Sequence, residues 1–139
     1  MTTRRKTAVF LDRDGTIIED RGHLRSPADV VFYPDTVLAL QRLQEHFSLF
    51  IVTHQPGVSG GILSAGEVAQ VNAHVVAELC RYGVVIDEVY CCPHRREELC
   101  GCIKPQPFFL KKAAREHGVD LKRSFVVAKP STGSSPATQ

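Results

Sequence analysis

Two aspartates separated by one residue follow a short apolar run near the start of the chain. Residues 8–11 are apolar, Asp12 and Asp14 come next, and Gly15 can turn the chain. Two carboxylates this close repel each other unless a cation lies between them. An aspartate can also attack phosphorus and carry the phosphoryl group as an acyl phosphate. The pair predicts a Mg²⁺-dependent site with Asp12 as nucleophile and Asp14 as the group that exchanges protons. The alternative is that both are turn and cap residues.

Two further side chains could assist phosphoryl transfer. Thr53 follows the apolar run 49–52 and can donate its hydroxyl to a phosphate oxygen. Lys104, which precedes Pro105, could neutralise charge that develops in the transition state. Taken alone, each of them is more typical of an ordinary strand-end threonine or a surface lysine than of a catalytic residue.

The elements that would position these residues alternate between strand-like and helix-like patterns. Strands are predicted over residues 7–11, 48–52, 84–90 and 124–128, and helices from Pro34 to Phe47 and over residues 64–82 and 107–117. Ser64 and Glu67 predict a capping box, and Gly83 predicts a helix end. The order predicts an α/β fold with a doubly wound parallel sheet, whose ligands bind at the carboxyl ends of the strands.

Composition and length limit the classes of function. The chain has 139 residues, a net charge of +2 and five cysteines. We expect one domain over residues 1–128 and a disordered tail over 129–139, which lacks apolar periodicity. The mild charge argues against nucleic acid, and we expect no membrane span and no signal peptide. The odd cysteine count is typical of a reducing compartment, so a cytoplasmic location is the expectation. We also expect a monomer.

A cysteine–histidine cluster follows the third predicted strand. Cys92, His94, Cys100 and Cys102 offer three thiols and one imidazole within a single loop. Four such ligands close a tetrahedron, which predicts a structural Zn²⁺ site that would hold Lys104 near the sheet edge. The alternatives are unconnected cysteines or an adventitious disulfide.

The remaining candidates have ordinary interpretations. Cys91 would point away from the cluster if the strand continues, and Cys80 is expected in the core. His46, His74 and His117 lie in helical patterns and are expected to have surface or packing roles. The glycine-rich segment 57–61 is either a phosphate cradle or a flexible loop.

Several of these motifs resemble those of a known superfamily. Residues 10–16, Phe-Leu-Asp-Arg-Asp-Gly-Thr, resemble the first signature of the haloacid dehalogenase (HAD) phosphohydrolases. Residues 52–55 resemble the second signature, and Lys104-Pro105 the third. The resemblance covers residues 7–128 and is greatest to the capless subgroup of D,D-heptose 1,7-bisphosphate and histidinol-phosphate phosphatases.

This resemblance implies specific roles. Asp12 would be the nucleophile and Asp14 the acid/base, and Mg²⁺ would contact the Asp12 side chain and the Asp14 main-chain carbonyl. Thr53 and Lys104 would stabilise the phosphoryl group, and the subgroup carries a similar zinc loop. The substrate would be a small phosphorylated sugar of lipopolysaccharide heptose biosynthesis, with histidinol phosphate as the alternative. The substrate-binding residues implied by the likeness are Asp20, Arg21, Gly22, His23, His54, Gln55 and Pro56.

The sequence also departs from the superfamily pattern. A Gly-Asp pair should follow the fourth strand and complete the Mg²⁺ site, but Lys129 stands there and no carboxylate follows Asp120. His54 stands where Asn is usual, and Ile103 where an Arg that helps to select substrate is usual. We therefore expect a chain that resembles a phosphatase cut short, with an exposed fourth strand, an incomplete Mg²⁺ site and reduced activity. A non-catalytic zinc-binding remnant is the alternative of another class.

Overall fold

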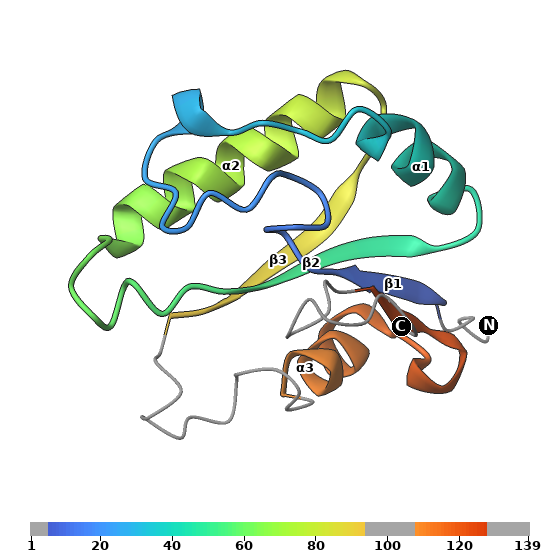
Figure 1. Ribbon diagram of the computed structural model, residues 1–139. Helices are drawn as coiled ribbons and strands as arrows, with labels where there is room; N and C mark the ends of the chain where they lie inside the picture. Colours follow the sequence, from blue (N-terminus) through green and yellow to red (C-terminus); the bar gives the residue numbers. More distant parts are fainter. Residues whose placement is uncertain (1–5, 94–107, 128–139) are drawn as a thin grey trace, which may run out of the picture.

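A four-stranded parallel sheet forms the centre of the protein. The computed structural model describes residues 6–93 and 108–127. The sheet runs in the order β3-β2-β1-β4 (Figure 1). All neighbouring strands pair in parallel, as predicted. Their bounds are β1 (Ala8–Leu11), β2 (Ser48–His54), β3 (Ile86–Cys92) and β4 (Phe125–Val127).

Helices cover both faces of the sheet. Helices α1 (Thr36–Leu43) and α2 (Ala65–Arg81) lie on one face, and α3 (Phe108–His117) lies on the other (Figure 1). This confirms the α/β class and the helical covering of two faces. Two short 3₁₀ turns, η1 (Pro27–Asp29) and η3 (Leu121–Arg123), were not predicted.

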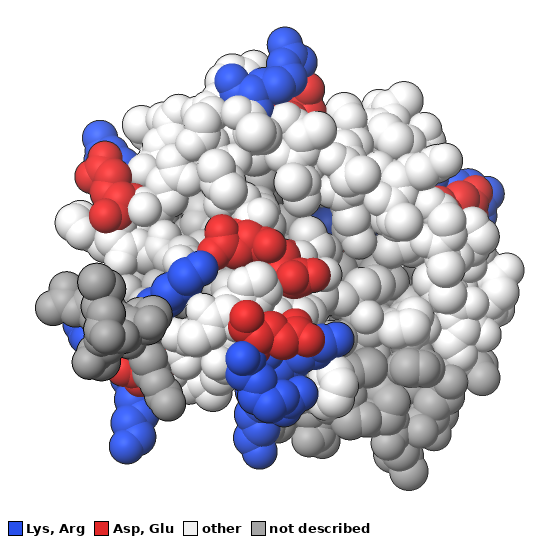
Figure 2. All heavy atoms as spheres, turned by 180° about the vertical axis from the view of Figure 1, so that it is seen from behind, with Lys and Arg blue, Asp and Glu red and all other residues white. Residues whose placement is uncertain are grey.

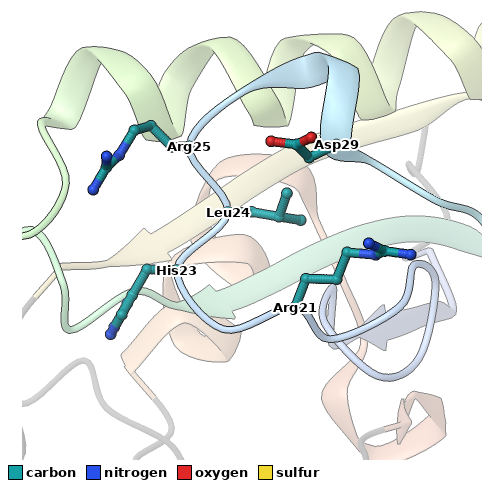
Figure 3. Close-up of a pocket in the computed structure, with 5 residues that line it drawn as sticks. All are labelled: Arg21, His23, Leu24, Arg25 and Asp29. Atoms are coloured by element: carbon teal, nitrogen blue, oxygen red, sulfur yellow. The ribbon is translucent and has the colours of Figure 1, made fainter.

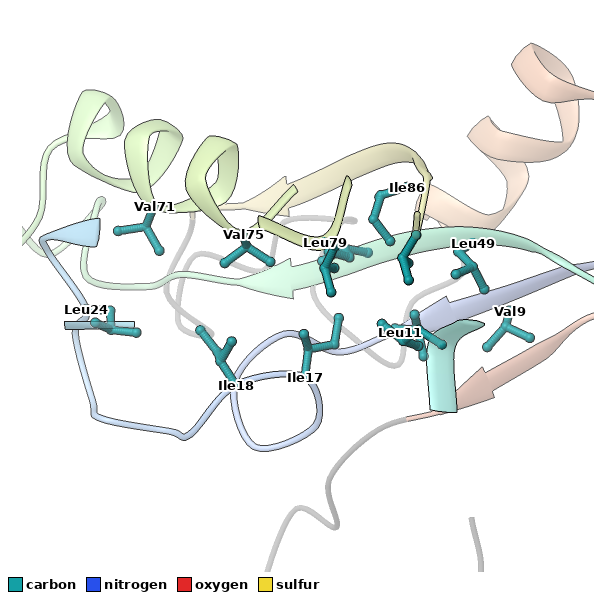
Figure 4. Close-up of a cluster of buried hydrophobic side chains, with 13 residues drawn as sticks. Val9, Leu11, Ile17, Ile18, Leu24, Leu49, Val71, Val75, Leu79 and Ile86 are labelled. Atoms are coloured by element: carbon teal, nitrogen blue, oxygen red, sulfur yellow. The ribbon is translucent and has the colours of Figure 1, made fainter. Parts of the chain in front are cut away.

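The larger hydrophobic core lies between the sheet and α2. Val71, Val75 and Leu79 project from α2 toward the strands, and all three are fully buried (Figure 4). Their spacing of four residues places them on one helix face. This packing fixes α2 over the sheet, because removing these side chains from water is favourable in proportion to their apolar area.

The second core lies between the sheet and α3 and is largely aromatic. Phe50 stacks on Phe10 with ring centroids 5.2 Å apart and on Tyr90 at 6.2 Å. Tyr90 in turn stacks on Phe109 of α3 at 5.2 Å. Since alternate residues of a strand point to opposite faces, Phe10 faces α3 while Val9 and Leu11 face α2.

The local signals at the ends of α2 are confirmed. The Ser64 hydroxyl accepts a bond from the Glu67 N–H at 3.0 Å, and the Glu67 carboxylate accepts one from the Ser64 N–H at 2.9 Å. Gly83 has φ 80°, a left-handed conformation that ends the helix at little steric cost. The capping box and the glycine stop therefore work as the sequence predicted.

Three other predictions about local structure were wrong in detail. Helix α1 ends at Leu43, so Phe47 lies outside it. Strand β2 continues to His54, two residues beyond the predicted range 48–52. Cys80 is exposed rather than in the core, because it lies one residue beyond the buried Leu79 and therefore off the buried face of α2.

Strand β4 lies at one side of the sheet and is poorly covered. Within the described residues it pairs with β1 alone, and Phe125 and Val126 are 57% and 49% exposed. This agrees with the expected exposed strand. The predicted tail, residues 129–139, lies outside the described part of the chain. Among the helices that the structure describes, none is long and apolar enough to cross a membrane.

Candidate active site

The two aspartates lie at the carboxyl end of β1, the edge at which parallel α/β sheets bind ligands. The Asp12 N–H donates to the carbonyl of Val127 on β4 at 3.0 Å, and the Asp12 Oδ1 accepts from the Arg13 N–H at 3.0 Å. Gly15 has φ 84° and donates its N–H to the Ile18 carbonyl at 2.8 Å. The turn after the acid pair therefore requires a conformation that favours glycine.

The side chain of Arg13 is buried and joins Asp14 to α2. It is only 1% exposed, and its Nη1 donates to Oδ1 of Asn72 at 2.7 Å. Its Nε and Nη2 donate to the two carboxylate oxygens of Asp14, each at 3.2 Å. A buried charge is costly unless it is paired and hydrogen-bonded, and these contacts supply both conditions.

Gln55 joins Asp14 to the end of β2. Its Nε2 lies 3.0 Å from Asp14 Oδ2 and 2.7 Å from the Thr53 hydroxyl oxygen, and Thr53 and Gln55 are both buried. The structure therefore brings Asp12, Asp14, Thr53 and Gln55 together at one edge of the sheet. In this arrangement the Gln55 amide is engaged with protein groups rather than open to the pocket described below.

Strand β3 places Cys91 beside this network, opposite Thr53 in the sheet register. Burial raises the pKa of the Cys91 thiol, while the Arg13 charge acts to lower that pKa and the Asp14 charge to raise it. The thiol thus lies within electrostatic range of the acid pair. It is partly buried and forms no disulfide.

The loop after β1 forms a pocket with a volume of about 470 Å³, lined by Arg21, His23, Leu24, Arg25 and Asp29. Figure 3 shows that His23 and Arg25 extend to one side of this loop and Arg21 to the other. The lining holds two arginines, one imidazole and one acid, and Arg21 Nη2 also pairs with Glu19 Oε1 at 2.9 Å. Two of the predicted substrate-binding residues, Arg21 and His23, therefore line a common cavity.

Contacts hold this loop against the segment after β2. Arg25 Nη2 donates to the Ile62 carbonyl at 3.0 Å, and Arg25 Nε lies 3.8 Å from a Glu67 carboxylate oxygen. The His23 ring packs against Gly57, where a Cβ atom would lie 2.7 Å from Nδ1. The glycine-rich segment 57–61 thus gives room to a pocket residue at its first position.

The other predicted substrate-binding residues are placed as follows. Asp20 Oδ1 accepts a bond from the Gly22 N–H at 3.0 Å in an exposed turn, and Gly22 has φ 74°. His54 is the last residue of β2, and Pro56 follows Gln55 in the loop beyond it.

The donor chemistry at the sheet edge fits Mg²⁺ in part. The Asp12 carboxylate and the Asp14 main-chain carbonyl are oxygen donors of the kind that Mg²⁺ takes, and water completes such sites. The Asp14 carboxylate is bonded to Arg13 and Gln55, which leaves its carbonyl as the donor to consider. Lys129, the predicted departure from the Mg²⁺ site, lies outside the described residues.

The predicted zinc cluster is described at one ligand only. Cys92 is buried at the end of β3 and is disulfide-bonded. A sulfur in a disulfide cannot bind zinc, so the two interpretations of the cysteine spacing exclude each other at this atom. His94, Cys100, Cys102 and Lys104 lie outside the described residues.

Charge elsewhere on the molecule gives little sign of another site. Acidic side chains gather near the middle of the face shown in Figure 2, and basic ones are scattered around them, so this face presents no continuous basic surface. One exposed group joins β3 and α3: the ligand atoms of Glu88, Glu116 and His117 lie within 4.8 Å of one another. His117 Nε2 lies 3.0 Å from Glu88 Oε1, and its ring packs on Phe50, which agrees with a packing role.

Curated relatives share the sequence across most of its length. The chain is 36% identical over 120 residues to a protein of Thermoplasma volcanium named "probable D-glycero-D-manno-heptose-1,7-bisphosphate 7-phosphatase", covering 86% of this chain and 82% of the relative. It is 35% identical over 128 residues to the D-glycero-β-D-manno-heptose-1,7-bisphosphate 7-phosphatase of Photorhabdus laumondii, covering 86% and 68%. No family model matches the chain.

Solved structures share the fold. The crystal structure of a protein from Mesorhizobium loti, described as a "putative HAD-like phosphatase", matches with a TM-score of 0.81 and 29% identity over 91% of this chain. The D,D-heptose 1,7-bisphosphate phosphatase of B. bronchiseptica, complexed with magnesium and phosphate, matches with a TM-score of 0.75 and 29% identity over 83% of this chain. This chain spans 66% of the length of the M. loti chain and 65% of the length of the B. bronchiseptica chain.

The parallel sheet with its acid pair at the carboxyl edge defines a phosphatase of the HAD-like class. Within that class, the chain belongs to the D,D-heptose 1,7-bisphosphate phosphatase family, as the level of identity over most of the relatives' length shows. The predicted resemblance to this family is therefore confirmed.

Two members of the site network were not singled out from the sequence. Arg13 lies inside the first motif, and a charged residue between two acids in a buried turn is a signal that could have drawn attention to it. Asn72 lies 59 residues away on α2. Its only sequence signal is a polar side chain next to the buried Val71 and close to Val75 along the helix.

Proposed function

We propose that the chain is a Mg²⁺-dependent phosphomonoesterase that acts through an aspartyl phosphate on a sugar bisphosphate like D-glycero-D-manno-heptose 1,7-bisphosphate. The observation that carries the proposal is the placement of Asp12, Asp14 and Thr53 at one sheet edge, where Gln55 bonds to Asp14 and Thr53 and the Arg13 N–H bonds to Asp12. Membership of the family supports the same substrate class, which remains a proposal for this chain.

The proposed reaction has two displacements at phosphorus. A carboxylate oxygen of Asp12 forms a bond to phosphorus while the bond to the sugar oxygen breaks, and Asp14 gives that oxygen a proton. Water then attacks the phosphorus, Asp14 takes a proton from it, and the Asp12–phosphate bond breaks to release inorganic phosphate. The Thr53 hydroxyl would donate to a phosphate oxygen, and Lys104 would offset its charge. Bound Mg²⁺ would supply positive charge between the carboxylate and the phosphate.

The pocket after β1 is the proposed place for the rest of the substrate. Arg21 and His23 line it, and the flanking Asp20, Gly22 and the 54–56 segment complete the set that the family likeness implies. Arginine and imidazole donors suit the hydroxyl and phosphate oxygens of a sugar phosphate. Histidinol phosphate remains the alternative substrate.

We further propose a structural Zn²⁺ at Cys92, His94, Cys100 and Cys102, which would form under reducing conditions. We also propose that turnover is low, because Lys129 stands where an acid would complete the Mg²⁺ site. A non-catalytic zinc-binding protein is the corresponding alternative, and normal zinc content without Mg²⁺-dependent turnover would support it.

The test is hydrolysis of heptose 1,7-bisphosphate and of histidinol phosphate with and without Mg²⁺, together with trapping of the acyl phosphate by acid quenching and mass spectrometry. Asp12→Asn should abolish turnover and the trapped phosphate, since an amide is a poor nucleophile. Asp35→Asn is the control, because the Asp35 side chain makes no cap bond at the start of α1. Turnover that survives Asp12→Asn would overturn the assignment of the nucleophile.

A further inference from the structure

A chain of hydrogen bonds runs from helix α2 to the acid pair. The Asn72 Oδ1 accepts from Arg13 Nη1 at 2.7 Å, and Arg13 in turn contacts both carboxylate oxygens of Asp14 at 3.2 Å. The Gln55 amide reaches the same carboxylate from β2 at 3.0 Å. Two independent elements of the fold therefore hold one carboxylate.

The Arg13 guanidinium has little freedom in this arrangement. Its side chain is 1% exposed, whereas Asp14 is 17% exposed and so opens toward solvent. A planar guanidinium that contacts both oxygens of a carboxylate fixes the direction of the carboxylate plane. The orientation of the guanidinium depends in turn on its third contact, because rotation about the Arg13 side chain would break the bond to Asn72.

Asn72 is well placed to supply that third contact. It is partly buried on α2, between the buried Val71 and Val75, which lock the helix against the sheet. An amide oxygen at this position can accept a bond from a guanidinium without adding a second negative charge next to Asp14. The core packing of α2 thereby determines where the acceptor lies.

We propose that Asn72 is a positioning residue for catalysis: it anchors the buried Arg13, which aims the Asp14 carboxylate at the reacting oxygen atoms. This inference rests on the proposed phosphatase function, in which Asp14 exchanges protons with the leaving group and water. Asn72 itself touches no reacting atom. Loss of its acceptor should therefore reduce the rate of the chemical step and leave substrate binding largely intact.

The test compares two substitutions at this position. Asn72→Leu keeps a similar volume and removes the acceptor, and it should lower kcat about ten- to hundredfold, the usual effect of a hydrogen bond to a charged group. KM should change by less than about threefold. Asn72→Asp keeps an acceptor oxygen but adds a negative charge near Asp14, so it should preserve the anchoring of Arg13 without necessarily preserving kcat. Gln70→Leu, at an exposed position of the same helix, is the matched control and should match the wild type.

A second measurement separates this inference from the proposed function. The Arg13 Nε–H proton should exchange slowly with water in a ¹⁵N NMR spectrum, since it is buried and bonded. Exchange should accelerate about tenfold or more in Asn72→Leu and stay slow in Asn72→Asp and Gln70→Leu. An unchanged exchange rate in Asn72→Leu overturns the anchoring role, whether or not the chain turns over substrate.

The kinetic outcomes decide the rest. Equal kcat in the wild type and Asn72→Leu overturns the positioning role, as does a loss in Asn72→Leu that appears as a rise in KM with kcat unchanged. A wild type that is inert toward both substrates contradicts the proposed function instead. In that case accelerated exchange in Asn72→Leu alone would still support the anchoring of Arg13.

Discussion

The replacement of Gly57 by alanine tests whether His23 contributes to substrate binding. A Cβ atom at this position would lie 2.7 Å from His23 Nδ1 and 3.2 Å from Leu63 Cδ1. Ordinary contact begins at 3.4 Å, so the imidazole must retreat by about 0.7 Å, the difference between 3.4 and 2.7 Å. Gly57 is not among the glycines with positive φ, so the backbone itself accepts alanine.

The expected effect is on affinity rather than on folding. His23 is exposed and its ring can swing into solvent, so the loss in free energy of unfolding should be below about 1 kcal/mol. If His23 binds the anionic substrate as proposed, a displaced ring loses that bond, and such bonds contribute about 1.5 kcal/mol or more. That value corresponds to a rise in KM of about tenfold. The rate constant kcat should change less.

The assay is steady-state hydrolysis of heptose 1,7-bisphosphate with Mg²⁺, or calorimetric binding of the same compound if turnover is too slow to measure. Gly66→Ala is the matched control, because the nearest atom to its Cβ would be Ser64 Oγ at 3.8 Å. It should leave KM unchanged and stabilise α2 by up to about 1 kcal/mol. In a His23→Ala background, Gly57→Ala should add nothing. A wild-type KM in Gly57→Ala would refute the role of His23, and unfolding would refute the steric reasoning.

Three further predictions concern stability and thiol chemistry. Leu79→Ala should lower the free energy of unfolding by about 2–5 kcal/mol in urea titrations, because Leu79 is fully buried on the sheet-facing side of α2. A loss below that range would show that the core collapses around the gap. Ser64→Ala should cost about 1 kcal/mol by the same measurement through loss of the cap on the Glu67 N–H, and an unchanged midpoint would count against the capping box. Iodoacetamide should alkylate the exposed Cys80 faster than Cys91, because burial raises the pKa of the Cys91 thiol. The alkylation rate of Cys91 should therefore still increase at pH values above the usual thiol pKa. Mass spectrometry of the peptides measures both rates, and equal rates would contradict this prediction.

Much of the fold was predictable because its signals are local. The apolar run before Asp12, the run before Thr53 and the capping box at Ser64 each depend on residues within a few positions of one another. The rule that parallel strands end at a common edge then brings Asp12 and Thr53 together without knowledge of the packing. The sheet order, with β1 between β2 and β4, satisfies that rule.

The rest of the site depends on contacts between distant residues. The bond from Arg13 to Asn72 spans 59 positions, and it exists only because α2 packs over the end of β1. The same holds for the packing of His23 against Gly57, which joins the loops after β1 and β2. The exposure of Cys80, by contrast, could have been predicted from local helix geometry. Cys80 is rotated by about 100° around the helix axis from its buried neighbour Leu79.

The two aspartates differ in how the protein holds them, and this difference affects how variants can be interpreted. Asp12 accepts a bond from the backbone N–H of Arg13, a contact that an asparagine oxygen can also accept. Asp14 is the carboxylate that pairs with the buried guanidinium of Arg13, so an amide there would leave a buried charge without its counter-ion. A loss of activity on replacing Asp14 therefore mixes chemistry with the loss of the Arg13 counter-ion, whereas Asp12→Asn keeps an acceptor for the Arg13 N–H and tests the proposed nucleophile. The mixed effect at Asp14 is why the indirect variant at Asn72, which keeps both charges in place, is the cleaner way to examine the proton-transfer step.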